Sequence, residues 1–452
     1  MATSDPGPQS RTQAALGLDY DGGDRLWESL GQMQISEEAA TPVSGTGQTT
    51  PAGGTWDFLA NAAQMFDQRA ELSHVTASDI GRGFDLQGYR RTGNELQHRL
   101  YMTYRRQVYP QTQGMPYNVM DARKRAVCVD NSAQFFRFRG SAMGESFRGH
   151  VGHFQLRDLL WATSAFDVFY PHADGIRRWD PGRGVSEFVV TWDQMPGAFK
   201  TTALCADRGV VFAGDWQGRY CVKALGGDRP WIASTTRHLR RNRGGPLTVS
   251  VSHNNGMVRH VDVARLAVTG MRQFAWAVNC TATAPDGSLH CVVGDSTESL
   301  LVDRRTTGVA ARLAGHLDYA FACAFSPDGM CVATGSQDMT VRLYDVRWPA
   351  EAVSAAGHLG AMRVVKFSSC GRFLMAAEPA DYVHVYDART LQKAQDIEVM
   401  GEIAGAAFAP DSQSLFFAVS DPMHSSGLVE FSDTAMPGSE CLGGVVSTDL
   451  LL

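Results

Sequence analysis

Residues 321–345 read FACAFSPDGMCVATGSQDMTVRLYD, and this stretch decides the fold. It contains three short runs rich in apolar and β-branched residues, Phe321–Ser326, Cys331–Gly335 and Thr340–Asp345. A Pro-Asp-Gly turn separates the first two runs, and a Gln-Asp turn separates the last two. Turn residues between such runs are typical of antiparallel strands. The stretch therefore predicts three consecutive strands, with a fourth at Val353–Ala356.

The pair that ends this stretch, Tyr344-Asp345, belongs to a repeat. Six other strand-like runs also end on an apolar or aromatic residue followed by an acid or, once, a cysteine: Trp179-Asp180, Tyr220-Cys221, Val261-Asp262, Val302-Asp303, Tyr386-Asp387 and Val429-Glu430. Successive second members are 41, 41, 41, 42, 42 and 43 residues apart. This period is about the length of one four-stranded propeller blade, and seven even repeats suit a closed ring without open sheet edges. The sequence predicts an all-β, seven-bladed propeller.

The last blade needs a strand from elsewhere in the chain. After Glu430 the sequence offers no convincing fourth strand. The alternating stretch Gln134–Arg139 is the best donor upstream of the first blade. We expect it to form the outer strand of the seventh blade, so that the two ends of the propeller close the ring.

Charge and composition divide the rest of the chain. Residues 1–80 carry 11 acids against 3 arginines, residues 81–125 carry 9 bases against 3 acids, and the whole chain has a net charge of −6. We predict a mostly disordered acidic region over 1–80, a basic helical segment over 81–130, the propeller over 131–435 and a tail over 436–452. Within the basic segment, apolar residues every four positions predict a helix from Asn94 to Val108.

Several features bear on the compartment. No apolar run approaches the roughly 20 residues that span a bilayer, and Met1–Ser10 shows no secretory signal. The 9 cysteines include no C-x-x-C pair, and most lie in apolar strand-like runs, where reduced and buried thiols are expected. The sequence predicts a monomer of the cytoplasm and/or nucleus, with no membrane partner.

No arrangement typical of catalysis or metal binding stands out. The chain has no H-E-x-x-H, no G-x-x-x-x-G-K-[ST] phosphate loop and no G-x-S-x-G, and its 13 histidines are dispersed. His150 and His153 are three residues apart, which on a strand places them on opposite faces. We expect no catalytic residues, no cofactor and no metal site, and a protein that is not an enzyme.

Gly315-His316 and Gly357-His358 each precede a Tyr-Asp pair by 27 residues, which resembles the GH…WD signature of WD40 repeats. In that family a His, a Ser/Thr, an Asp and a Trp form a structural tetrad across the blade. The resemblance assigns these places in the fifth blade to His316, Thr334, Asp338 and Tyr344, with Tyr in place of Trp. In the sixth blade Ala380 takes the place of the turn Asp and Asp381 follows one residue late, so Asp381 is expected to matter less than Asp338.

Five segments further resemble a small WD-repeat (transducin-like) family of plants and fungi without an assigned activity: residues 153–165, 294–304, 315–330, 372–388 and 401–422. The similarity covers roughly residues 84–432. The third blade departs from it, because Arg237–Pro246 is basic and glycine-rich where a first strand would be expected. The resemblance adds to the fold prediction and names no mechanism.

Blades four, five and six each carry a D-x-R triplet where the third strand ends: Asp303-Arg304-Arg305, Asp345-Val346-Arg347 and Asp387-Ala388-Arg389. The triplet is similar to the box by which many WD40 proteins dock, as substrate receptors, on the adaptor of a cullin-RING ubiquitin ligase. Equivalent places in adjacent blades line one rim, where a guanidinium can make a forked pair with a partner carboxylate.

Three function hypotheses follow from these features. The first is a scaffold or adaptor that binds other proteins through the propeller, with a partner that the sequence does not name. The second is a substrate receptor of a cullin-RING ligase that docks through the D-x-R arginines Arg305, Arg347 and Arg389. The third, with less support, is a nucleic-acid-associated protein that uses the arginines of residues 81–125 and of Arg237–Arg243.

Overall fold

The structure, a computed structural model, describes residues 72–90, 105, 114–152, 157–195, 198–215, 217–227, 230–234, 238–242, 248–420 and 426–435. Residues 58–452 form one compact unit, and the described residues belong to it. The predicted helix at Asn94–Val108, except for Arg105, and the predicted tail over 436–452 lie outside the described residues, as does nearly all of the region 1–80.

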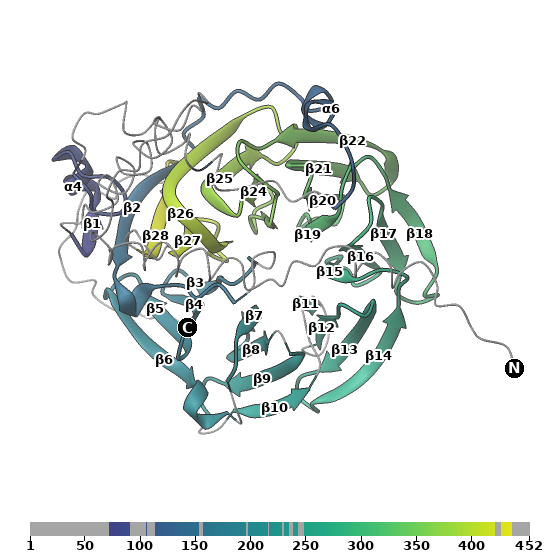
Figure 1. The fold of residues 1–452 in the computed structure, drawn as a ribbon, viewed down its shortest axis with the longest axis horizontal. Coiled ribbons are helices and arrows are strands. Elements are labelled where there is room, and N and C mark those ends of the chain that lie inside the picture. The colour runs from purple at the N-terminus through teal and green to yellow at the C-terminus, as the bar shows by residue number, and fades with distance from the viewer. Residues whose placement is uncertain are drawn as a thin grey trace, which may run out of the picture. The chain divides into compact units, whose positions relative to one another are not determined.

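The sheets of this unit are arranged as a ring (Figure 1). The inner strands in the described part of the chain are β3 (Trp161–Ser164), β7 (Thr201–Asp207), β11 (His238–Asn242), β15 (Val278–Thr283), β19 (Ala320–Phe325), β23 (Val364–Phe367) and β26 (Ala394–Phe408). Each inner strand contacts the next one, and β26 contacts β3. The ring is therefore closed through its inner strands, and the predicted all-β propeller is confirmed.

The first five blades are separate four-stranded antiparallel sheets, each built outward from its inner strand. The outer three strands of blade one are β4 (Asp167–His172), β5 (Gly175–Asp180) and β6 (Val185–Thr191), and those of blade two are β8 (Val210–Asp215), β9 (Arg219–Ala224) and β10 (Trp231–Ser234). Blade three has β12 (Thr248–Ser252), β13 (Met257–Asp262) and β14 (Ala267–Gln273), and blade four has β16 (Leu289–Gly294), β17 (Ser299–Asp303) and β18 (Val309–Leu313). Blade five has β20 (Cys331–Ser336), β21 (Thr340–Asp345) and β22 (Trp348–Ala356). The third strand of blade five has the predicted bounds.

The remaining strands form one eight-stranded sheet, because a single long strand joins two blades. The first part of β26 pairs with β25 (Ala380–Asp387) as an outer strand, and its last part pairs with β27 (Ser414–Ser420) as an inner strand. Blade six is β23, β24 (Phe373–Ala377), β25 and β26; blade seven is β26, β27, β28 (Gly427–Asp433) and β2 (Phe136–Met143). With β26 counted in both blades, the described strands form seven groups of four.

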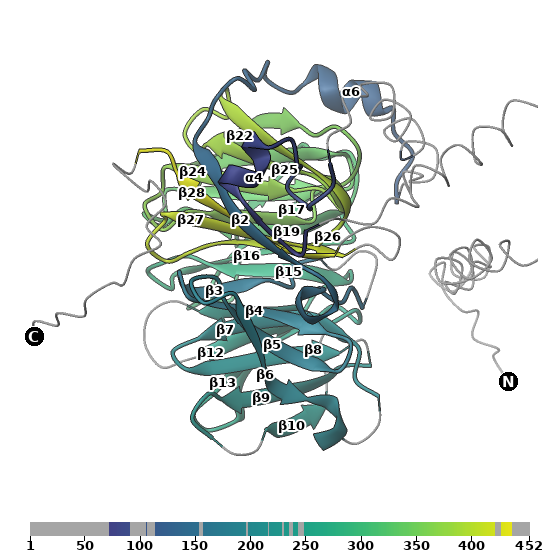
Figure 2. The ribbon, with the colours of Figure 1, turned by 90° about the vertical axis from the view of Figure 1, so that its left-hand side faces the viewer.

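The ring closes with a strand from the N-terminal side, as predicted. β2 pairs antiparallel with β28, from Phe136 opposite Asp433 to Met143 opposite Gly427. The observed strand begins two residues later than the predicted one and continues to Met143. A further short strand, β1 (His74–Thr76), pairs with the outer side of β2 (Figure 2).

The segment before β2 follows the perimeter of blades five and six. The helix α6 (Val119–Lys124) contacts β22, and the backbone N–H of Val127 donates to the carbonyl of Ser354. Isolated bridges then join Asp130 to Lys393, which directly precedes β26, and Ser132 to Gln395 on β26. The remaining described helical segments are α4 (Ala77–Gly81) and the 3₁₀ turns η2 (Glu145–Phe147) and η3 (Trp192–Gln194). None of the described helices is long and apolar enough to cross a membrane.

Blade three has its inner strand at the expected place. The basic stretch that departs from the family pattern still provides the inner strand β11, which pairs with β12 from His238 opposite Ser252 to Asn242 opposite Thr248. Backbone pairing on a strand does not depend on apolar side chains, so the ladder of the blade sets the strand here.

Two stacked histidines at the contact of blades three and four predict a loss of stability in acid. The rings of His260 and His290 lie 4.8 Å apart. Burial and the nearby Arg304 lower the pKa of His260 to about 4, and burial with the His260 and Arg304 charges lowers the pKa of His290 to about 3. Both pKa values lie below that of an unfolded histidine, about 6.5. The two neutral histidines therefore do not reduce the stability of the fold above pH 6.5. The fold loses stability as the pH falls from 6.5 toward 4, because the unfolded chain binds protons that the buried rings cannot take up.

Urea unfolding at pH 7 and pH 5 measures this effect. We expect His290→Gln to lose less stability between the two pH values than the wild type does. His74→Gln, which changes an exposed histidine, is the matched control and should keep the full acid sensitivity. An equal acid loss in wild type and His290→Gln would contradict the assignment.

Candidate functional site

The three D-x-R triplets lie at one end of the ring. They follow β17, β21 and β25, the third strands of blades four, five and six. First and third strands run in the same direction, because each is antiparallel to the second. Backbone hydrogen bonds tie each triplet to the turn between the first two strands of its blade: Arg304 to Ser288, Val346 to Met330 and Ala388 to Arg372.

Each aspartate of the triplets fixes the turn that carries its arginine. Oδ1 of Asp303 accepts the backbone N–H of Arg305 at 2.8 Å, and Oδ1 of Asp387 accepts that of Arg389 at 3.1 Å. Oδ1 of Asp345 accepts the backbone N–H of Arg347 in the same way, at 2.9 Å. These are Asx turns, in which a short acidic side chain replaces a backbone acceptor. The arginines therefore sit on ordered turns at equivalent places.

The side chains of Arg305, Arg347 and Arg389 are all exposed, and we call this row the arginine rim. The three are not equivalent. Arg347 forms a fork with its own Asp345, with Nε at 3.0 Å and Nη2 at 2.6 Å from the carboxylate oxygens. Hydrogen bonds from Arg347 lower the pKa of Asp345 to about 2. The pair is open to solvent, where ion pairs exchange partners at little cost.

A central cavity opens at the same end of the ring. It has a volume of about 390 Å³ and is lined by the ends of inner strands and the turns that follow them. Phe325, Phe367 and Phe408 supply apolar lining, and Lys366 and Asp207 supply charge. Nζ of Lys366 lies 2.6 Å from the carboxylate of Asp158. The cavity is thus a mixed apolar and charged hollow beside the arginine rim.

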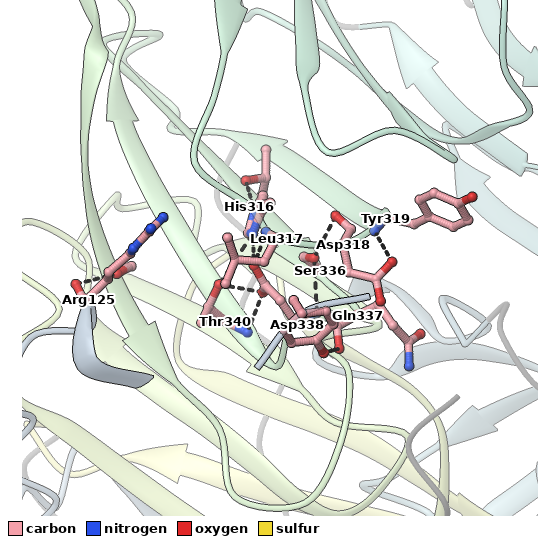
Figure 3. A network of polar contacts seen from close by, with 12 residues as sticks. Arg125, His316, Leu317, Asp318, Tyr319, Ser336, Gln337, Asp338 and Thr340 are labelled. Carbon is pink, nitrogen blue, oxygen red and sulfur yellow. Dashed lines mark hydrogen bonds and ion pairs between the residues drawn. The ribbon is translucent and has the colours of Figure 1, made fainter. Parts of the chain in front are cut away.

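Two of the four residues assigned to the structural tetrad of blade five, His316 and Asp338, lie in a buried polar network together with Thr340 (Figure 3). Nδ1 of His316 is 3.0 Å from Oδ2 of Asp338, and its Nε2 is 2.7 Å from Oγ1 of Thr334. The hydroxyl of Tyr344 donates to the carbonyl of Ala314 at 3.0 Å. Burial alone would raise the pKa of Asp338, but His316 holds it well below its usual value. The network joins the entry of the blade to its second and third strands.

Blade six replaces this network with a different carboxylate. Glu378 corresponds to Ser336 of blade five, 42 residues earlier, and its longer side chain accepts the backbone N–H of Leu359 at 2.7 Å. The same bond is made in blade five by Asp338, with the N–H of Leu317. A carboxylate therefore holds the blade entry although Ala380 occupies the turn position.

Asp381 has a separate role, which the sequence pattern did not indicate. Its carboxylate lies 2.8 Å from Nε of Arg105, and the side chains of the two residues are 2% and 4% exposed. It also accepts the N–H of Gly401 at 3.0 Å. The pair fastens the basic segment to blade six. Arg105 is buried, so it is not part of a surface for phosphate binding.

One cluster escaped the sequence prediction altogether. His358, His384 and Asp396 come together in blade six, although 38 residues separate the first from the last. The prediction of no metal site rested on the dispersal of the histidines along the chain. Alignment of blades five and six at a period of 42 is the signal that places His384 and Asp396 on neighbouring strands and His358 at the entry of the blade.

Comparisons with known proteins agree with this architecture. The model of the WD domain, G-beta repeat, matches residues 309–345. Over 106 residues the chain is 32% identical to Pre-mRNA-processing factor 19 homolog 2 of Arabidopsis thaliana, and this covers 24% of the chain and a fifth of that relative. A chain in a crystal structure of the mitotic checkpoint complex superposes with a TM-score of 0.54 and 16% identity, over 68% of this chain and 97% of that one. The matched repeat, the relative and the ring of antiparallel sheets identify the chain as a WD40-repeat protein with a β-propeller fold.

Proposed function

We propose that this chain is a non-catalytic scaffold that binds carboxylate-rich segments of other proteins along the arginine rim. The observation that supports the proposal is the row of exposed Arg305, Arg347 and Arg389 on ordered turns of three consecutive blades. Neighbouring blades of a propeller offer equivalent places at a regular spacing, which suits binding of an extended partner along one rim.

The chemistry of the rim favours an acidic partner. Arginine presents a planar fork that matches a carboxylate in a bidentate way, and it is enriched at protein interfaces. Asp303 and Asp387 are engaged by backbone N–H groups, which leaves the adjacent guanidinium groups of Arg305 and Arg389 in solvent. Arg347 can exchange Asp345 for a partner carboxylate at the exposed surface.

A finer candidate is a substrate receptor of a cullin-RING ubiquitin ligase. It is favoured by the D-x-R triplets, which are similar to the docking box of such receptors. In this candidate the rim binds the ligase adaptor, and other surfaces of the propeller bind the substrate. The similarity to the pre-mRNA-processing relative supports a location in the nucleus, whether the chain is a general scaffold or a ligase receptor. Nucleic acid is the weaker candidate, because Arg105 of the basic segment is buried against Asp381.

Charge reversal of the rim tests the proposal. We expect Arg305→Glu combined with Arg389→Glu to reduce partner capture from cell extract at least tenfold, because two exposed guanidinium groups become carboxylates that repel an acidic partner. Substitution of exposed turn residues changes stability by about 0.5 kcal/mol or less, so the melting temperature should stay close to that of the wild type. Quantitative mass spectrometry of proteins captured by the full chain gives the measurement.

Exposed arginines outside the rim provide the control. Arg183→Glu combined with Arg312→Glu reverses two charges whose side chains are 83% and 64% exposed, and it should leave capture unchanged. Recovery of the cullin adaptor by the wild type, and its loss in the rim variant, supports the receptor candidate. Capture of the same partners by the wild type and the rim variant would refute a role for the rim.

A further inference from the structure

Three side chains with metal-ligating atoms meet in blade six. His358 precedes β23, His384 lies on β25 and Asp396 lies on β26. Nε2 of His358 is 2.7 Å from Oδ2 of Asp396, and Nδ1 of His384 is 2.7 Å from Oδ1 of the same carboxylate. The ligating atoms of the three residues all lie within 4.8 Å of one another.

The WD40 repeat does not require this cluster. Ser336, Arg342 and Ser354 of blade five correspond to Glu378, His384 and Asp396 of blade six, each 42 residues later. Register confirms the last two correspondences, because Arg342 pairs with Ser354 and His384 pairs with Asp396. Blade five holds its entry with a single histidine and a single aspartate. Blade six therefore has histidine or carboxylate side chains at three positions where blade five has two serines and an arginine.

Glu378 orients the central histidine of the cluster. Its Oε1 is 2.8 Å from Nε2 of His384, so the opposite ring nitrogen faces Asp396. Backbone N–H groups of His358 and Leu359 donate to the Glu378 carboxylate at 2.6 and 2.7 Å and hold it in place. Histidines that ligate a metal usually bind such a carboxylate through their other ring nitrogen.

We propose that His358, His384 and Asp396 bind a divalent transition-metal ion of the zinc class, with Glu378 as a positioning residue. Two imidazole nitrogens and a carboxylate oxygen are donors that zinc prefers. Ligand atoms around tetrahedral zinc lie about 3.4 Å apart. The two histidine–carboxylate pairs at 2.7 Å therefore need to open by roughly 0.7 Å, and the widest separation in the cluster, 4.8 Å at most, needs to close by roughly 1.4 Å. The side chain of His358 is 37% exposed, which gives an ion a path from solvent and leaves room for water as a further ligand.

The test uses the untagged full chain after treatment with EDTA, with zinc chloride as the probe. Isothermal titration calorimetry should give about one zinc ion per chain, and the ion should raise the melting temperature, because it binds the folded state. Cobalt(II), bound in the same place, should produce the visible absorption bands of a tetrahedral site. His358→Ala should weaken zinc binding by roughly 100-fold or more and remove the cobalt bands.

Two controls separate loss of the metal from loss of the fold. His74→Ala removes an exposed histidine on β1 and should bind zinc as the wild type does. In EDTA, His358→Ala should unfold at nearly the same urea concentration as the wild type, because its ring is partly exposed. Glu378→Gln should weaken zinc binding by about 10- to 100-fold without abolishing it. A wild type that binds no zinc, or a His358→Ala chain that binds it equally tightly, overturns the proposal.

Discussion

Phe136→Ala should lower the free energy of unfolding by about 3–5 kcal/mol, the usual cost of removing a buried aromatic ring. Phe136 begins β2, the strand that closes the ring, and its side chain is fully buried. Its ring packs against Phe373 of blade six and Phe408 of blade seven, with centroids 5.0 and 5.8 Å away. The amide of Gln395 also bonds both the N–H and the carbonyl of Phe136. Removal of the Phe136 ring therefore leaves an empty space where blades six and seven meet the closing strand β2.

An exposed phenylalanine provides the matched control for this experiment. Phe166→Ala removes the same ring from a side chain that is 56% exposed, so its cost in urea unfolding should be about 0.5 kcal/mol or less. A chain that begins at Gly144 lacks β2 altogether and should lose cooperative unfolding, because β28 then has an unpaired edge. A chain that begins at Leu72 keeps β1 and β2 and should melt close to the full chain. Equal melting of the two shortened chains would contradict closure by β2.

The fold was predictable where pattern and turn chemistry agree. β21 has the predicted bounds because alternating apolar residues lie between turns on both sides. β2 begins two residues later than predicted because its limits are set by pairing with β28, nearly 300 residues away. The sequence pattern gave no local support for the inner strand β11, because the stretch is basic, and its pairing with β12 defines it. Contacts that are distant in sequence leave little trace in a local pattern.

The same division holds for the candidate site. Equivalent positions of the repeat led to the exposed arginine rim and to the contacts of His316 with Thr334 and Asp338. The repeat could not indicate that Glu378 takes over the role of the missing turn aspartate, since the two differ in position and length. The ion pair of Arg105 with Asp381 joins residues 276 positions apart, from segments that share no repeat. Such pairs become visible only when the chain is folded.

The two buried aspartates of these blades should both be costly to remove. Asp338→Ala leaves the backbone N–H groups of Leu317 and Thr340 without their acceptor, and we expect a loss of about 3 kcal/mol. Asp381→Ala removes one partner of a buried ion pair, for which the typical loss is about 3–5 kcal/mol. The sequence alone predicted the smaller effect at Asp381. From the structure we expect the opposite order, because Asp381 holds the basic segment to blade six.

Urea unfolding of the two variants beside Asp328→Ala measures the difference. Asp328 lies in an exposed turn of blade five, where it accepts the N–H of Met330, and its removal should cost well under the loss at Asp338. The comparison keeps the residue type constant and varies only its burial. A loss at Asp381 below that at Asp328 would mean that Arg105 is not fastened to blade six in solution. A loss at Asp338 equal to that at Asp328 would remove the tetrad network as a source of stability.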